Sequence, residues 1–126
     1  PGPVGSLLRA LGGIPVERDQ RSGLVASLTR EFASAERLVV AVPPEGTRGR
    51  TDHWRTGFYR VACAAEVPIV CSYLDYSRRV GGFGPLIDPT GDIVADLSLF
   101  QDFYADKRGK YPHGESNIAL RPSDAA

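Results

Sequence analysis

The strongest indication of the fold is a continuous apolar run from Leu38 to Val42. The run is rich in valine and ends at Pro43 and Pro44, which lack the backbone N–H that a central strand needs. Uninterrupted apolar strands are typical of sheets that helices cover on both faces. The run therefore predicts an α/β domain with this strand inside its sheet.

Helical periodicity surrounds the run. Three segments carry apolar residues at the spacing of an α-helix and are predicted helices: Gly23–Ala35, Thr56–Glu66 and a third with Ile93, Leu97, Phe100 and Tyr104 on one face. Ser22 is the candidate N-cap of the first helix, and Thr90 or Asp92 is that of the third.

Further strands are predicted before and after the run. Ile14–Val16 is a brief strand that Pro15 restricts to a sheet edge, and Val67–Leu74 is the next strand. Asp75–Pro89 is strand or hairpin sequence around a glycine-containing turn. Because strands alternate with helices, the order implies βαβ units. The expected fold class is therefore α/β, with a mostly parallel sheet flanked by helices.

Parallel strands also predict where ligands bind. The loops Glu17–Arg21 and Glu45–Arg50 both follow the carboxyl ends of predicted strands. In a parallel sheet these ends share one edge, where ligands usually bind. We therefore expect Arg18 and Arg48 to face one crevice.

Length and composition limit the remaining possibilities. A chain of 126 residues suffices for one domain with a core, which we assign to residues 1–110. Residues 111–126 are expected to form a loose polar tail, with docking of Ile118–Leu120 as the alternative. The 15 basic and 15 acidic residues cancel, which argues against nucleic acid as a partner. Cys63 and Cys71 match no zinc spacing and form no disulfide framework, so we expect no metal.

The residues most suited to chemistry follow the two prolines. Glu45, Gly46, Thr47 and Arg48 offer a carboxylate, a flexible turn, a hydroxyl and a planar guanidinium without a gap. An arginine fork matches a phosphate, so this loop is a candidate site for a phosphorylated substrate. The alternative is a solvated turn with a structural Glu45–Arg48 pair.

Three motifs resemble those of the glycerophospholipid acyltransferase family, in the family's order and at about its spacing. They are Gly13-Ile14-Pro15-Val16-Glu17-Arg18 for its second motif, Pro44-Glu45-Gly46-Thr47-Arg48 for its third and Val67-Pro68-Ile69-Val70 for its fourth. The stretch Trp54–Tyr76 and the Gly81–Gly82 turn also resemble a bacterial branch of this family. The likeness makes residues 1–110 part of an acyltransferase domain.

The resemblance implies a function in phospholipid biosynthesis. The family moves a fatty acyl group from a coenzyme A or acyl-carrier-protein thioester to the hydroxyl of a lysophospholipid or glycerol phosphate, with no metal or bound cofactor. By this likeness the acceptor site consists of Arg18, Glu45, Gly46, Thr47 and Arg48, the two arginines holding the phosphate. It also implies a place at the cytoplasmic side of the membrane, through peripheral contact or an anchor in a preceding segment.

The family's first motif, a histidine followed after four residues by an aspartate, does not occur in this sequence. His53 and His113 are followed at that distance by Phe58 and Ile118. The pair supplies the general base, and in the family it precedes the second motif. We therefore expect the catalytic histidine and aspartate upstream of Pro1, which makes this chain the carboxyl-terminal portion of the domain and inactive alone. The alternatives are a degenerate relative and a non-catalytic module that binds phosphorylated lipid.

Two residues beside the third motif complete the candidates. His53 is expected at the surface of a polar loop. Trp54 is expected either to pack against the adjoining helix or, with Arg55, to lie near a lipid headgroup.

Overall fold

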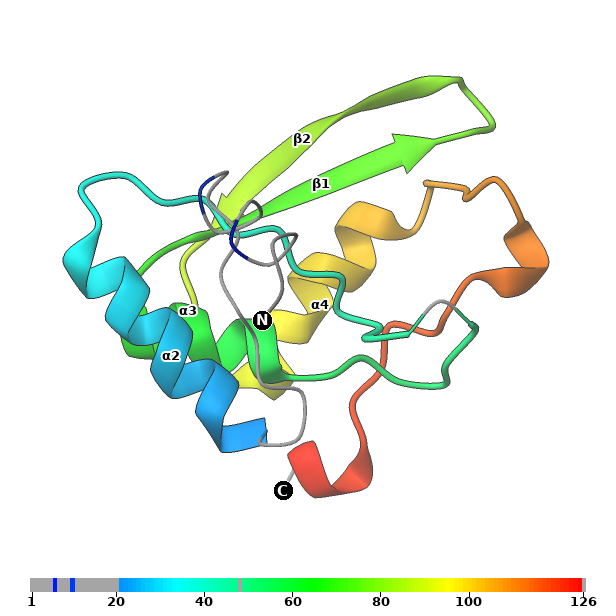
Figure 1. Ribbon diagram of the computed structural model, residues 1–126. Helices are drawn as coiled ribbons and strands as arrows, with labels where there is room; N and C mark the ends of the chain where they lie inside the picture. Colours follow the sequence, from blue (N-terminus) through cyan, green and yellow to red (C-terminus); the bar gives the residue numbers. More distant parts are fainter. Residues whose placement is uncertain (1–5, 7–9, 11–20, 48, 126) are drawn as a thin grey trace.

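Helices α2, Arg21–Ser34, and α3, Gly57–Ala65, pack against each other (Figure 1). They belong to a computed structural model that describes residues 6, 10, 21–47 and 49–125. Leu28 on α2 and Tyr59, Val61 and Ala62 on α3 are buried. The predicted apolar faces thus cover one another, and the helices begin and end within two residues of the predicted bounds.

The second half of the fold is a β-hairpin laid over a third helix. Strands β1, Ile69–Asp75, and β2, Val80–Ile87, form a two-stranded sheet, and α4 spans Ile93–Tyr104 (Figure 1). Cys71 and Ile87 of the sheet pack with Phe100 of α4 and with Trp54 in a shared core. Asp92 caps α4, because its carboxylate accepts hydrogen bonds from the N–H groups of Val94 and Ala95, each at 3.1 Å.

The prediction of a mostly parallel sheet is wrong for the described residues. β1 and β2 pair antiparallel, with Val70 opposite Leu86 and Asp75 opposite Val80. The four residues between them make a tight connection, which joins antiparallel strands, whereas parallel strands need a long crossover. Buried Asp75 fixes this connection by accepting hydrogen bonds from the backbone N–H of Ser77 at 3.0 Å and its hydroxyl at 2.6 Å. The mixed α/β class holds, and the hairpin interpretation of residues 75–89 is confirmed.

The apolar run Leu38–Val42 is not a strand. It has no ladder partner among the described residues, and the side chain of Val39 is 90% exposed. Hydropathy predicted a buried strand here, but a strand also needs a neighbour for its backbone groups. Within residues 21–47 and 49–125, β1 and β2 pair only with each other. Ile14–Val16 and the loop at residues 17–20 lie outside the described residues.

The C-terminal region docks through its residues 115–121, which we call the strap. Two short 3₁₀ turns, η1 at Pro112–Gly114 and η2 at Pro122–Asp124, flank it. The strap runs beside the loop that precedes α3, where the Trp54 N–H donates to the Ala119 carbonyl at 2.8 Å and the Asn117 N–H donates to the Thr51 carbonyl at 3.1 Å. The segment Ile118–Leu120 is therefore docked, which is the alternative that the sequence left open beside a loose tail.

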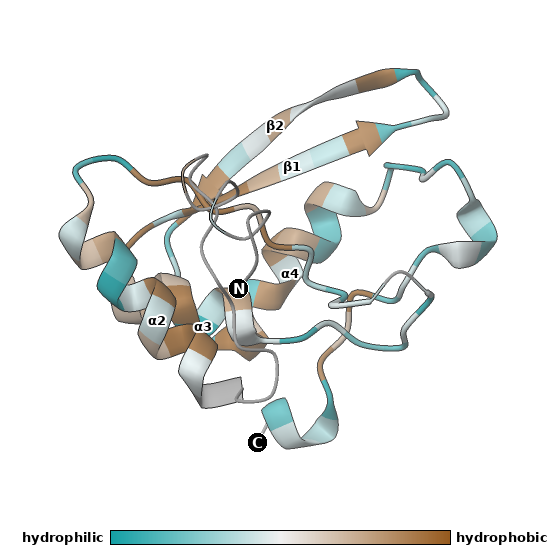
Figure 2. Cartoon of the chain, viewed as in Figure 1, coloured by the Kyte–Doolittle hydropathy of each residue, from teal (hydrophilic) through white to brown (hydrophobic). Residues whose placement is uncertain are grey.

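Hydrophobic residues gather where α2 and α3 meet, and others lie along the exposed segment that follows α2 (Figure 2). Within the described residues, no helix combines the length and the apolar character needed to cross a bilayer.

Candidate functional site

The Pro43–Thr47 segment forms a tight turn against the loop before α3. The Gly46 N–H donates to the Pro43 carbonyl at 3.2 Å, and the Arg55 N–H donates to the Pro44 carbonyl at 2.7 Å. Gly46 adopts a φ of 66°, a left-handed conformation that favours glycine. The predicted glycine turn is therefore present in the structure.

Arg55 brings a cation to this turn. A methyl group built on Gly46 would lie 2.4 Å from Arg55 Cδ and 2.5 Å from Arg55 Nε, so the arginine stem crosses directly over the glycine. The sequence motif ends at Arg48 and did not indicate this contact. It depends on the backbone hydrogen bond between Arg55 and Pro44, which are eleven positions apart.

The other predicted acceptor residues are only partly placed. Glu45 is half-buried, Gly46 and Thr47 are exposed, and the Thr47 hydroxyl accepts a 3.3 Å hydrogen bond from the Gly49 N–H. Arg18 and Arg48 lie outside the described residues. Their common crevice remains a prediction, and its original basis, a parallel sheet, does not hold in the described part of the chain.

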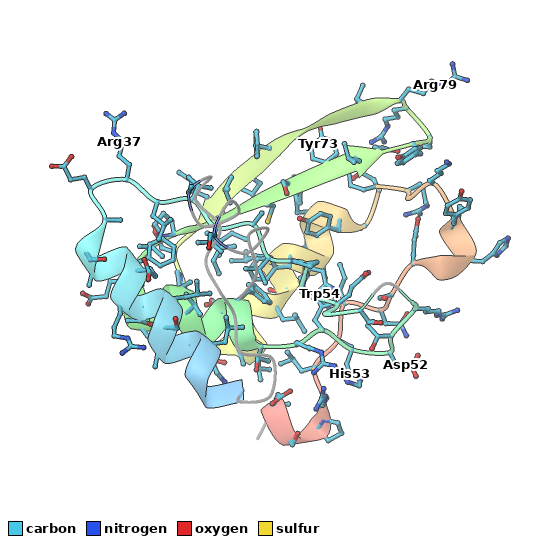
Figure 3. All side chains as sticks on the ribbon, in the orientation of Figure 1. Arg37, Asp52, His53, Trp54, Tyr73 and Arg79 are labelled. Carbon is cyan, nitrogen blue, oxygen red and sulfur yellow. The ribbon has the colours of Figure 1, made fainter. Side chains whose placement is uncertain are left out.

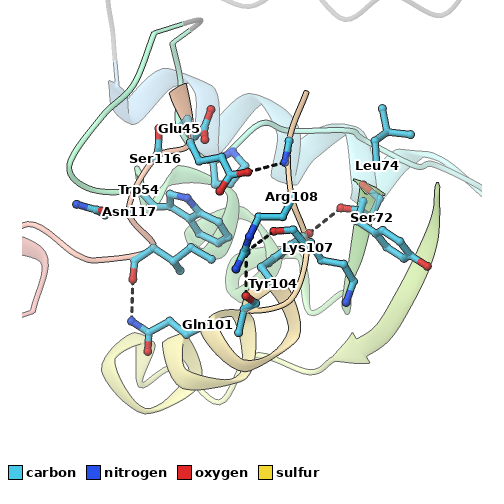
Figure 4. Close-up of a pocket in the computed structure, with 16 residues that line it drawn as sticks. Glu45, Trp54, Ser72, Leu74, Gln101, Tyr104, Lys107, Arg108, Ser116 and Asn117 are labelled. Carbon is cyan, nitrogen blue, oxygen red and sulfur yellow. Dashed lines mark hydrogen bonds between the residues drawn. The ribbon is translucent and has the colours of Figure 1, made fainter. Parts of the chain in front are cut away.

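Glu45 lines a cavity of about 650 Å³ (Figure 4). Its wall comes from five parts of the chain: the turn, the loop before α3, β1, the end of α4 with the residues after it, and the strap. The lining residues are Pro44, Glu45, Trp54, Ser72, Tyr73, Leu74, Gln101, Tyr104, Ala105, Lys107, Arg108, Gly109, Glu115, Ser116, Asn117 and Ile118.

Trp54 forms the aromatic side of this cavity. Its ring meets those of Phe58, Phe100 and Tyr104 edge to face, with centroids 5.9–6.0 Å apart, and it is only 7% exposed. Figure 3 shows it pointing inward from its loop. The prediction that Trp54 packs against the adjoining helix is confirmed by its contact with Phe58 of α3.

Tyr104 lines the cavity as a neutral hydrogen-bond donor. Its hydroxyl donates to the Ser72 carbonyl at 2.8 Å. Burial raises the pKa of Tyr104 to about 12, and neighbouring Cys71 adds to the effect. At neutral pH the phenol keeps its proton, so it does not act as a base there.

The basic residues of the cavity are already engaged. Lys107 Nζ pairs with Asp106 Oδ1 at 2.5 Å and lies 4.5 Å from the centre of the Phe103 ring. The Arg108 guanidinium donates to the carbonyls of Ala105 at 3.0 Å and Lys107 at 2.7 Å. A hydrogen bond from Lys107, and to a smaller extent one from Arg78, holds the pKa of the Asp106 carboxyl below its usual range. These contacts hold Lys107 and Arg108 against the residues that end and follow α4.

The two histidines lie in different surroundings. His113 is exposed in η1. His53 is half-buried, and its Nε2 accepts a 2.7 Å hydrogen bond from Arg121 Nε of the strap. His53, which we expected at the surface of a polar loop, is thus half-buried and ties the strap to the loop before α3.

Metal ligands do not gather in the described part of the chain. No group of three or more histidine, cysteine, aspartate or glutamate side chains is arranged to hold an ion within residues 21–47 and 49–125. Both cysteines are free thiols, and burial raises the pKa of Cys71.

The sequence patterns did not predict the part of the cavity wall that comes from residues after Leu74 in the chain. Gln101, Lys107 and the strap reach the cavity through contacts that span up to 68 positions along the chain. The apolar triplet Ile118–Leu120 inside a polar tail was the available signal, because it marks a segment that packs.

Comparison with protein families identifies the chain's relatives. The family model described as Acyltransferase matches residues 2–74, which include all three sequence motifs, Glu45 and the loop before α3. No curated protein and no solved structure gives a significant match.

Proposed function

Because the chain belongs to the acyltransferase family, we propose that it binds the acceptor in the transfer of a fatty acyl group from a coenzyme A or acyl-carrier-protein thioester to a lysophospholipid or glycerol phosphate. General acyltransferase function follows from the family. The acceptor, the donor carrier and a role in phospholipid biosynthesis are parts of the proposal.

One observation carries the proposal: the family's third motif opens onto the cavity. Glu45 contributes to the cavity wall, and Gly46 and Thr47 lie exposed beside it. A carboxylate at this position accepts a hydrogen bond from an acceptor hydroxyl, while Arg18 and Arg48 bind the phosphate with their planar guanidinium groups. Arg55, which crosses Gly46, adds positive charge at the same turn.

The experiment compares two acceptors that differ only in the phosphate. Calorimetric titration of the chain should show binding of lysophosphatidate and much weaker binding of monoacylglycerol. Arg48→Ala should weaken lysophosphatidate binding about 30-fold, because a lost charge-assisted contact costs about 2 kcal/mol.

Arg79→Ala is the matched control. It removes the same charge from the far end of the β-hairpin (Figure 3) and should leave binding unchanged. Equal binding of the two lipids, or equal losses in the two variants, would contradict the proposal.

A non-catalytic lipid-binding module is the second candidate function, and the sequence feature that favours it is the lack of an HxxxxD pair in these 126 residues. The two candidates differ in turnover. Formation of phosphatidate from acyl-CoA and lysophosphatidate by the protein that carries this chain supports the enzyme, whereas binding without turnover supports the module.

Action at the cytoplasmic surface of a membrane is also part of the proposal. Its support is the outer face of the β-hairpin, where Leu74, Phe83 and Leu86 are 69%, 78% and 68% exposed. Apolar side chains that gather on one exposed face favour contact with lipid or with another protein surface.

A further inference from the structure

The strap follows the loop before α3 and is hydrogen-bonded to the backbone of that loop at three points. The Thr51 N–H donates to Ser116 Oγ at 2.9 Å, and the Thr51 carbonyl accepts from the Asn117 N–H at 3.1 Å. Further along the loop, the Trp54 N–H donates to the Ala119 carbonyl at 2.8 Å. These bonds fix both ends of residues 51–54 to the strap.

Side chains complete the attachment of the strap. Arg121 Nε donates to His53 Nε2 at 2.7 Å. Gln101 of α4 holds the middle of the strap by donating to the Ile118 carbonyl at 2.7 Å (Figure 4). Within the described part of the chain, Thr51 and His53 have no hydrogen bond except those with the strap and the one from the Thr51 hydroxyl to the His53 carbonyl. The strap therefore determines the path of this part of the loop.

Trp54 links the part of the loop that the strap holds to the part that follows. Its indole is 7% exposed and is fixed in the core by edge-to-face contacts with three rings, and its N–H is fixed by the strap. Because a peptide group is planar, only the φ and ψ angles of Trp54 separate the peptide that the strap holds from the peptide that carries the Arg55 N–H. The strap and the core together therefore orient the Arg55 N–H.

Arg55 in turn holds the turn formed by residues 43–47, which we call the third-motif turn. Its N–H donates to the Pro44 carbonyl at 2.7 Å, and its stem crosses directly over Gly46. Pro44 and Gly46 are the sequence neighbours of Glu45, so Arg55 fixes the backbone on both sides of this carboxylate. Within the described residues, no hydrogen bond or ion pair joins the turn to the strap directly, so the connection between them runs through Trp54 and Arg55.

We propose that the strap positions the third-motif turn: Ser116 and Arg121 hold the loop, and the loop holds the turn through Trp54 and Arg55. The strap residues are positioning residues, because they act on the backbone that presents Glu45. The strap lies beyond the family-matched residues, so a different part of the chain controls the geometry of the candidate site. The consequence for ligand binding rests on the proposed function, whereas the coupling itself does not.

Amide hydrogen exchange of the whole chain, measured by NMR, tests the coupling without a ligand. The N–H groups of Gly46 and Arg55 report on the turn, because they donate to the carbonyls of its two prolines. Arg121→Ala removes the contact with His53 and should speed exchange of both amides about fivefold, the value of one hydrogen bond of about 1 kcal/mol. The amide of Phe100 in α4 should keep its wild-type rate.

A second strap variant, a rescue and a control accompany this measurement. Ser116→Ala removes the acceptor of the Thr51 N–H without changing a charge, and it should speed exchange of the same two amides. Arg121→Lys retains a donor for His53 and should restore most of the protection. His113→Ala changes an exposed residue outside the strap and should exchange like the wild type.

The coupling should also be measurable in the reverse direction, because the free energy that links two sites is the same from either side. Gly46→Ala disturbs the turn and should therefore speed exchange of the Trp54 N–H, which is bonded to the strap. Gly49→Ala, whose added methyl group meets nothing within 4 Å, is the control and should leave this amide unchanged.

Two exchange results would overturn the inference. Faster exchange at Trp54 with unchanged rates at Gly46 and Arg55 would show that the strap fastens only the loop. Equal acceleration at Phe100 and in the turn, in both strap variants, would show that the strap stabilises the whole fold and does not position the turn in particular.

Titration with lysophosphatidate separates this inference from the proposed function. Arg121 does not line the cavity, so the expected rise in Kd of about fivefold in Arg121→Ala acts through the turn. Arg79→Ala removes the same charge from the far end of the β-hairpin and should bind like the wild type (Figure 3). Wild-type binding with unchanged Kd values in Arg121→Ala and Ser116→Ala would overturn the role of the strap and leave the proposed function standing. If the wild type does not bind lysophosphatidate, the proposed function fails, while hydrogen exchange still decides whether the strap positions the turn.

Discussion

Tyr59 of α3 donates its hydroxyl proton to the carboxylate of Asp96 on α4, with 2.6 Å between the phenolic oxygen and Asp96 Oδ2. Both side chains are buried, at 4% and 3% exposure. Thr90 adds two donors to the same carboxylate, its N–H at 2.8 Å from Oδ2 and its hydroxyl at 3.0 Å from Oδ1. Since α3 follows the candidate loop and α4 lines the cavity, this network holds two sides of the site together.

Asp96→Asn should destabilise the protein by about 2 kcal/mol. The neutral amide removes the negative charge that strengthens these hydrogen bonds, and its NH₂ group replaces one of the two oxygens that accept from Tyr59 and Thr90. Urea unfolding measures the change. Asp102→Asn alters an exposed residue of the same helix and should stay within about 0.5 kcal/mol of the wild type. Equal unfolding free energies of the two variants would show that the network is dispensable.

Alkaline pH should weaken the fold through Tyr59. Burial raises the pKa of Tyr59 to about 12, and the hydrogen bond to Asp96 adds to this effect. Between about pH 10 and the folded pKa, the unfolded tyrosine has lost its proton while the folded one keeps it, so stability falls as pH rises. Urea unfolding at pH 9 and pH 11.5 should show a smaller fall in Tyr59→Phe than in the wild type.

The control for this titration is Tyr111→Phe, which changes a side chain that is 71% exposed. It should retain the pH dependence of the wild type. The pKa of buried Tyr104 is also raised to about 12, so this residue contributes its own loss of stability at alkaline pH in every variant. An identical pH dependence in the wild type and Tyr59→Phe would assign the whole effect to other groups.

Local sequence signals predicted the helices and the turns well. The Asp92 cap and the apolar spacing from Ile93 to Tyr104 specify α4 within one stretch of sequence, and the structure confirms both. The prediction of a strand at Leu38–Val42 is wrong because hydropathy indicates a preference for burial but does not supply the neighbouring strand that a strand needs. The prediction of a parallel sheet is wrong for a related reason. The short connection between Asp75 and Val80 makes the two strands antiparallel, and the sequence was compatible with either a strand or a hairpin there.

In the candidate site, too, the sequence predicted the part that depends on neighbouring residues and not the part that depends on distant ones. The Gly46 turn is specified by neighbouring residues and was therefore visible in the sequence. The cavity beside it depends on pairs such as Thr51 with Ser116 and His53 with Arg121, which are 65 and 68 positions apart. Such contacts depend on the complete fold, and one sequence does not reveal them.

The outer face of the hairpin should bind lipid vesicles. Val70 stands opposite Leu86 and Ser72 opposite Phe83, which places large apolar side chains on the exposed face. Replacing Phe83 and Leu86 together by serine should lower sedimentation with phosphatidylglycerol vesicles about tenfold, since each buried apolar side chain contributes about 1.5–3 kcal/mol when fully desolvated and less at an interface. Val94→Ser on α4, 54% exposed, is the control. Equal sedimentation of the double variant and the control would contradict membrane contact through this face.

Gly46→Ala should damage the candidate turn selectively. The alanine must hold a φ of 66°, which costs about 1 kcal/mol, and its methyl group displaces the Arg55 stem. We expect a loss of about 1 kcal/mol in urea unfolding together with weaker binding of glycerol 3-phosphate. Gly49→Ala, whose added methyl group meets nothing within 4 Å, should leave both quantities unchanged. Adding Arg55→Ala to Gly46→Ala removes the clash but keeps the backbone strain, so it should restore little stability. Full recovery in that double variant would mean that Arg55, and not the left-handed backbone, makes glycine necessary here.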